Sequence, residues 1–131
     1  MPRQRILVVD GSKYFDTSIW RMLIPETEFE IVGLAGSTDE TIKMVITLSP
    51  DIVLVDLSHP QTCGLQTVTA LHAVQPYLPI ITFMPISSQE YTRASLNAGA
   101  SACLPKSEMA DILPQTLRFL TSNPSPAMPI S

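Results

Sequence analysis

Three charged residues from distant parts of the chain suggest a site for metal or phosphoryl chemistry. Asp10 and Asp56 each follow directly after four apolar residues, and Lys106 stands two residues beyond a weaker apolar run. Two carboxylates and an ammonium group can hold a hard divalent cation through oxygen ligands and steer a phosphoryl group. Each residue alone is more often the start of a solvated loop, but all three together favour a site.

The elements that must position these residues follow from an alternation of apolar blocks with amphipathic segments. The first and third blocks are apolar on both faces, which is typical of parallel strands covered by helices on each side. Because parallel strands need crossover connections, five alternations of strand and helix predict a doubly wound α/β fold with a parallel sheet. In such folds the functional crevice lies at the carboxyl ends of the strands. The predicted strands are 6–9, 31–35, 52–55, 80–84 and 100–104.

Five helices are predicted to alternate with these strands. A capping box at Ser37–Glu40 opens the second helix, and Gly99 closes the fourth. The fifth runs from about 109 to 120, and we place Pro114 in its first turn, where a missing N–H costs little. The apolar stripes that mark the first four helices lie within 15–23, 42–46, 65–71 and 91–98.

Composition excludes several classes of function. A chain of 131 residues, 45% of them hydrophobic, fits one domain with a single core. A net charge of −4 without a basic stripe argues against nucleic-acid binding, and no apolar run reaches the roughly 18 residues that span a bilayer. Cys63 and Cys103 lack metal-ligand spacing, so a reduced, cytoplasmic setting is expected. We expect a folded domain over 1–121 and a proline-rich flexible tail or linker over 122–131.

Four stretches of the sequence resemble the receiver domain of bacterial two-component response regulators, over about Arg5–Leu120. They are RILVVD, DIVLVDLSHPQTCGL, PIITFM and LNAGASACLPKS. The second is the most specific, because Pro60 and Gly64 follow Asp56 at the spacing of the family's phosphoacceptor loop. The resemblance implies a flavodoxin-like sheet of order 2-1-3-4-5 flanked by five helices.

By this resemblance the chain is a regulated switch in phosphorelay signal transduction and not an enzyme with its own substrate. Asp56 would take a phosphoryl group from a histidine kinase or a phosphotransfer protein, and Lys106 would bind that group. Asp10, Asp56 and the backbone carbonyl of Ser58 would hold Mg²⁺. Phosphorylation would then change the face formed by the fourth helix, fifth strand and fifth helix, where a homodimer can form.

Three residues depart from the pattern of the family. Gly11 stands where a second acid usually contacts the metal, so Mg²⁺ binding is expected to be weak. Met84 stands where a Ser or Thr hydroxyl usually binds the phosphoryl group, and its thioether cannot donate a hydrogen bond. Thr82 is no clear replacement, because it lies about 6–7 Å further back along the strand. Cys103 takes the place of a frequent switching Tyr or Phe.

These departures leave two interpretations open beside the phosphorylated switch. One is a phosphorylation-independent pseudo-receiver that works as a protein-interaction module, which Gly11, Met84 and Cys103 together would favour. The other is a flavodoxin-like enzyme or cofactor carrier, which is disfavoured because the sequence has neither a G-x-G-x-x-G motif nor a P-loop. The nucleophile and the lysine are both in place, so the phosphorylated switch is the preferred reading.

Overall fold

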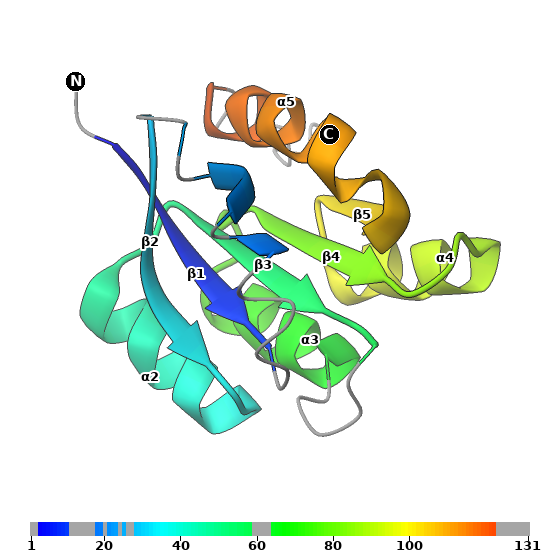
Figure 1. Ribbon diagram of the computed structural model, residues 1–131. Helices are drawn as coiled ribbons and strands as arrows, with labels where there is room; N and C mark the ends of the chain where they lie inside the picture. The colour runs from blue at the N-terminus through cyan, green and yellow to red at the C-terminus, as the bar shows by residue number, and fades with distance from the viewer. Residues whose placement is uncertain are drawn as a thin grey trace.

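The computed structural model describes residues 3–10, 18–19, 21–23, 25, 28–58 and 64–122. Within these ranges, five parallel strands form one sheet in the order β2-β1-β3-β4-β5, as predicted (Figure 1). The strands are β1 (Gln4–Val9), β2 (Phe29–Ala35), β3 (Ile52–Asp56), β4 (Ile80–Met84) and β5 (Ala102–Pro105). The prediction for β4 is confirmed at both ends, whereas β1 and β2 begin two residues earlier than predicted and β5 begins two residues later.

The sheet divides the core into two layers. Alternate residues of the central strands point to opposite faces, so Ile6 and Val8 belong to one apolar cluster and Leu7 and Val9 to the other. All four side chains are fully buried. Burial on both faces explains why the central strands read as unbroken apolar runs instead of alternating ones.

Helices cover both faces of the sheet (Figure 1). Those after β2 are α2 (Thr38–Leu48), α3 (Gly64–Val74), α4 (Gln89–Ala98) and α5 (Met109–Ser122), with a short 3₁₀ turn, η2 (Lys106–Glu108), before α5. Helices α2 and α3 cover one face and α5 the other, while α4 packs beside α3 and β5. Of the helix predicted over 15–23, residues 18–19 and 21–23 are described and helical, and Ile19 and Leu23 belong to the same buried cluster as the leucines of α5.

The predicted helix ends at Ser37 and Gly99 are confirmed. The Ser37 hydroxyl accepts a hydrogen bond from the backbone N–H of Glu40 at 3.2 Å, and the Glu40 carboxylate accepts one from Gly36 at 2.6 Å. Gly99 follows α4 with φ of +118°, a left-handed conformation that suits glycine. A Cβ atom there would lie 2.4 Å from the ring of His72, so both backbone and packing require a glycine.

The placement of Pro114 in the first turn of the last helix is wrong. Helix α5 begins at Met109, which puts Pro114 in the second turn, inside the helix. The lost hydrogen bond and the ring clash cost about 3 kcal/mol in a helix interior. Tertiary packing offsets that cost, because Leu113, Leu117 and Leu120 on one stripe of α5 are buried, each contributing about 1.5–3 kcal/mol.

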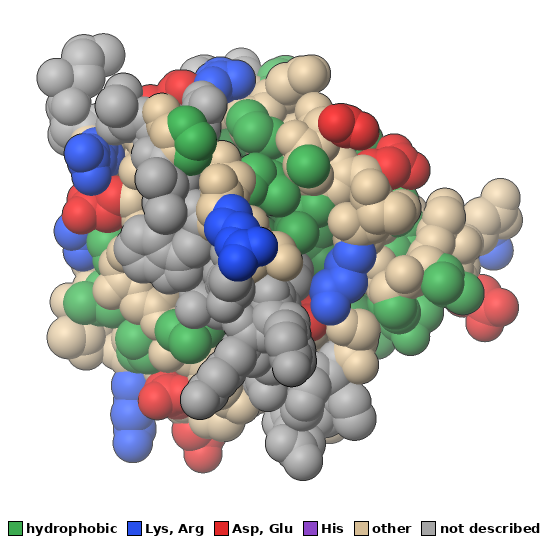
Figure 2. Space-filling view, in the orientation of Figure 1, with side chains coloured by type: hydrophobic (Ala, Val, Ile, Leu, Met, Phe, Trp, Pro, Cys, Tyr) green, Lys and Arg blue, Asp and Glu red, His purple; other side chains and the backbone are tan. Residues whose placement is uncertain are grey.

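The distribution of charged side chains on the surface agrees with the low net charge of the sequence. On the face drawn in Figure 2, Lys and Arg side chains are dispersed among acidic ones and do not form a basic stripe among the described residues. Within the described ranges no helix is both long and apolar enough to cross a membrane. Residues 123–131 of the predicted tail lie outside the described residues.

Candidate functional site

The three charged residues singled out in the sequence stand at the carboxyl ends of three strands. Asp56 is the last residue of β3, Asp10 directly follows β1, and Lys106 directly follows β5. Val9 pairs with Val55 in the neighbouring strand, so Asp10 and Asp56 occupy adjacent positions one residue further along. Strand β4 lies between β3 and β5, and the long lysine side chain must cross its end to reach Asp56.

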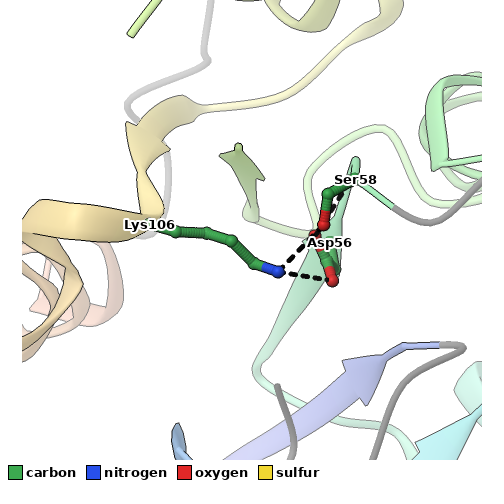
Figure 3. Close-up of polar contacts among 3 residues, drawn as sticks. All are labelled: Asp56, Ser58 and Lys106. Atoms are coloured by element: carbon green, nitrogen blue, oxygen red, sulfur yellow. Dashed lines mark hydrogen bonds and ion pairs between the residues drawn. The ribbon is translucent and has the colours of Figure 1, made fainter. Parts of the chain in front are cut away.

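Asp56 and Lys106 form an ion pair (Figure 3). The Lys106 Nζ donates to the Asp56 Oδ2 at 3.0 Å. The Asp56 side chain is only 1% exposed, whereas that of Lys106 is 32% exposed. A buried carboxylate needs a compensating partner, and here that partner is an amine that still contacts solvent.

Ser58 completes a closed network with this pair (Figure 3). Its backbone N–H donates to the Asp56 Oδ1 at 2.9 Å, and its hydroxyl donates to the same oxygen at 2.5 Å. The Ser58 Oγ in turn accepts a hydrogen bond from the Lys106 Nζ at 2.9 Å. Sequence reasoning expected only the backbone carbonyl of Ser58 at the site and missed its hydroxyl. The available signal was a serine two residues after an aspartate, a spacing at which such side chains bond locally.

Asp10 is the second buried acid at this end of the sheet, with 5% exposure. Its backbone N–H donates to the carbonyl oxygen of Ala35 at 2.9 Å, which extends the β1–β2 ladder by one residue. Alternation along the strands directs Asp10 and Asp56 to the same face of the sheet. Two carboxylates and a backbone carbonyl are oxygen donors of the kind that suit Mg²⁺. Among the described residues, no three His, Cys, Asp or Glu side chains are grouped as a metal site.

The residues that depart from the family pattern have other partners. Met84 is 4% exposed, and its sulfur lies 3.8 Å from the Thr92 hydroxyl. The Thr82 hydroxyl donates to Ser95 of α4 at 3.0 Å and lies 3.4 Å from the carbonyl oxygen of Ala102. It therefore bonds toward α4 and β5 and not toward Asp56. Cys103 is partly buried and pairs with Thr82 across β4 and β5. Gly11 lies outside the described residues.

Comparisons with known proteins agree on one family. The model of the response regulator receiver domain matches residues 6–118. The chain is 37% identical over 102 residues to a protein-glutamate methylesterase/protein-glutamine glutaminase of Syntrophomonas wolfei, covering 76% of this chain and 29% of that protein. It is 31% identical over 121 residues to the protein of that name from Lawsonia intracellularis, covering 91% and 34%. The chain thus spans about a third of the length of these relatives.

Solved structures show the same fold at lower identity. The response regulator domain of Thermotoga maritima CheB superposes with a TM-score of 0.81 at 21% identity, covering 92% of this chain and 97% of that one. A LuxR-family two-component response regulator from Aurantimonas superposes with a TM-score of 0.84 at 21% identity, covering 92% and 86%.

Proposed function

Because this chain belongs to the response regulator receiver domain family, we propose that it is a phosphorylated switch whose acceptor is Asp56. The observation that carries the proposal is the buried Asp56 carboxylate with the Lys106 amine 3.0 Å from it. An oxygen of the carboxylate attacks phosphorus, and the bond from phosphorus to the donor nitrogen of a phosphohistidine breaks. The electron pair leaves with the imidazole, and Lys106 neutralises charge that gathers on the phosphoryl oxygens.

Mg²⁺ is the cofactor that this reaction needs in the proposal. Asp10, Asp56 and the backbone carbonyl of Ser58 would hold it, and it would supply further neutralisation of phosphoryl charge. We expect its affinity to be low, because Gly11 replaces a second acid. Gly11→Asp should then lower the Mg²⁺ concentration that half-saturates phosphorylation by about tenfold, which corresponds to a carboxylate ligand worth about 1.4 kcal/mol.

Phosphorylation by a small donor tests the proposal. The protein is incubated with acetyl phosphate over a wide range of Mg²⁺ concentrations, and its intact mass is measured. One added phosphoryl group is expected, and it should be absent in Asp56→Asn. Asp39→Asn, at an exposed position in the first turn of α2, is the matched control and should react like the wild type. No adduct at any Mg²⁺ concentration would overturn the proposal.

The partner that supplies the phosphoryl group in the proposal is a cytoplasmic histidine kinase or phosphotransfer protein. The output is a change at the face formed by α4, β5 and α5, where a homodimer can form. Thr82 couples two of these elements, because its hydroxyl bonds to α4 and approaches a carbonyl of β5. In the proposal these residues act as a regulated switch and not as an enzyme with its own substrate.

A pseudo-receiver that signals without phosphorylation is the second candidate. The observation that favours it is the end of β4, where Met84 offers no donor and the Thr82 hydroxyl is bonded elsewhere. Light scattering with and without beryllofluoride, a phosphoryl mimic, separates the two candidates. A pseudo-receiver should keep the same oligomeric state with and without beryllofluoride, and Asp56→Ala should not change it. A phosphorylated switch whose output is dimerisation should dimerise when beryllofluoride is added to the wild type, and Asp56→Ala should not respond.

A further inference from the structure

The network around Asp56 contains a hydroxyl that the pattern of the family does not require. We propose that Ser58 supplies the hydroxyl hydrogen bond to the phosphoryl group that the end of β4 does not supply in this chain. The inference rests on the proposed function of Asp56 as the phosphoacceptor. It assigns Ser58 a direct contact with the transferred group, in addition to the backbone carbonyl offered to the metal.

Two threonine hydroxyls near the end of β4 are already engaged in hydrogen bonds. Thr82 lies in the preceding part of the strand, is fully buried, and bonds to Ser95. Thr92 is the described hydroxyl that contacts Met84, and it donates to the carbonyl oxygen of Ser88 at 2.9 Å. Each of these hydroxyls would have to break a hydrogen bond within the fold before it could turn toward Asp56.

The hydroxyl of Ser58 is already hydrogen-bonded to the Asp56 carboxylate, and the direction of its proton is fixed by its two partners. An ammonium group can only donate and an ionised carboxylate can only accept. Since the Ser58 Oγ accepts from Lys106 at 2.9 Å, its own proton must point to the Asp56 Oδ1. The hydroxyl is therefore oriented as a donor toward the carboxylate before any phosphoryl group arrives.

Phosphorylation changes which atom is the better acceptor for that proton. When a carboxylate oxygen of Asp56 bonds to phosphorus, the carboxylate loses its charge, while the new phosphoryl oxygens carry charge. A donor prefers a charged acceptor, so the Ser58 hydroxyl turns from the carboxylate to a phosphoryl oxygen and keeps its own proton. Ser58 is exposed, so this exchange takes place where a phosphodonor can approach.

The first test compares Ser58→Ala, which removes the hydroxyl, with Ser58→Thr, which keeps it. The readouts are the rate of phosphoryl-protein formation from acetyl phosphate and the affinity for Mg²⁺ with beryllofluoride. We expect Ser58→Ala to reduce both by about tenfold to a hundredfold, the effect of losing a hydrogen bond to a charged group. Ser58→Thr should stay close to the wild type. Ser87→Ala, at an exposed serine after β4, is the matched control and should change neither readout.

A second test asks whether a hydroxyl at position 84 can replace the Ser58 hydroxyl as the hydrogen-bond donor to the phosphoryl group. Met84→Thr introduces a hydroxyl at the strand end where the chain has a thioether. If Ser58 replaces that hydroxyl, Met84→Thr should restore most of the lost rate in the Ser58→Ala background and change the wild type little. Thr82→Val should leave both readouts unchanged, because its hydroxyl bonds to α4. Circular dichroism melts of every variant establish that each is folded.

The outcomes separate this inference from the function on which it rests. If the wild type is phosphorylated and Ser58→Ala is phosphorylated equally fast, the role of Ser58 is overturned while the function stands. If Ser58→Thr is phosphorylated as slowly as Ser58→Ala, the shape of the side chain at position 58 and not its hydroxyl determines the rate. That result also overturns the role of Ser58. If the wild type takes no phosphoryl group at any Mg²⁺ concentration, both fall together.

Discussion

At the scale of single residues, Asp56 has a carboxylate that is nearly inaccessible to solvent. Its two oxygens have different partners, with Ser58 on Oδ1 and Lys106 on Oδ2. A buried ion pair is weak evidence for stability, because desolvation opposes the attraction, but loss of one partner leaves the other charge uncompensated. The ion pair is therefore a weak argument for stability, and its burial is consistent with the proposed role of Asp56 as the phosphoacceptor.

A double-mutant cycle measures how strongly the pair is coupled. We expect Lys106→Met to lower the free energy of unfolding by about 1–3 kcal/mol, because the buried carboxylate loses its cation. The lower part of that range is expected, since Lys106 is about a third exposed and solvent screens it. Asp56→Asn in the Lys106→Met background should recover most of the loss. Urea denaturation of the four proteins gives the coupling, and effects that add within about 0.5 kcal/mol would contradict it.

At the scale of elements, helix ends and strand ends carry the features on which the site depends. Helix α4 connects β4 to β5 along the chain, and it is capped by Ser88 at its start and by Gly99 at its end. The buried bond from Thr82 to Ser95 then ties the strand to the helix. A change at the end of β4 or β5 is thus adjacent to α4, the element expected to report phosphorylation.

The end of α4 offers a prediction with a matched control. Gly99→Ala should lower the free energy of unfolding by about 1–3 kcal/mol, because alanine is strained at φ of +118° and its Cβ would collide with His72. Gly36→Ala should change stability by less than about 0.5 kcal/mol, because the nearest atom to its Cβ is a flexible Glu40 oxygen at 3.7 Å. Thermal and urea unfolding of both variants test this. Equal losses at the two positions would contradict the packing described at Gly99.

At the scale of the whole molecule, the candidate site joins the carboxyl ends of β1, β3 and β5, elements far apart in the chain. A ligand that binds only when Asp10, Asp56 and Lys106 are assembled must favour the folded state over the unfolded one. Binding at the site and global stability are therefore linked, and stability reports on occupancy even when no reaction follows.

This linkage gives a prediction for the whole chain. Mg²⁺ with beryllofluoride at a hundred times its dissociation constant should raise the free energy of unfolding by about 2.7 kcal/mol. Neither Mg²⁺ nor beryllofluoride alone should reach that effect, and Asp56→Ala should abolish it. Calorimetry at several ligand concentrations checks both statements. An equal rise in Asp56→Ala would mean that the ligand binds away from Asp56.

The apolar pattern of the sequence predicted the fold class, and the resemblance to the receiver domain implied the strand order. The pattern also placed Asp10, Asp56 and Lys106 at the carboxyl ends of strands, where the structure has them. Apolar periodicity is local, so it can be read along the chain, and a parallel sheet aligns its carboxyl ends whatever the details of packing. The helix caps at Ser37 and Gly99 were also predictable, because a cap bonds to backbone groups only a few residues away in the sequence.

Other features were decided by the tertiary structure. Pro114 is tolerated inside α5 because the burial of Leu113, Leu117 and Leu120 offsets its cost, a balance that no local rule contains. The Thr82 hydroxyl bonds to α4, and the Ser58 hydroxyl lies between Asp56 and Lys106. Which partner a hydroxyl selects depends on the side chains that folding brings within about 3 Å, and those come from distant parts of the chain.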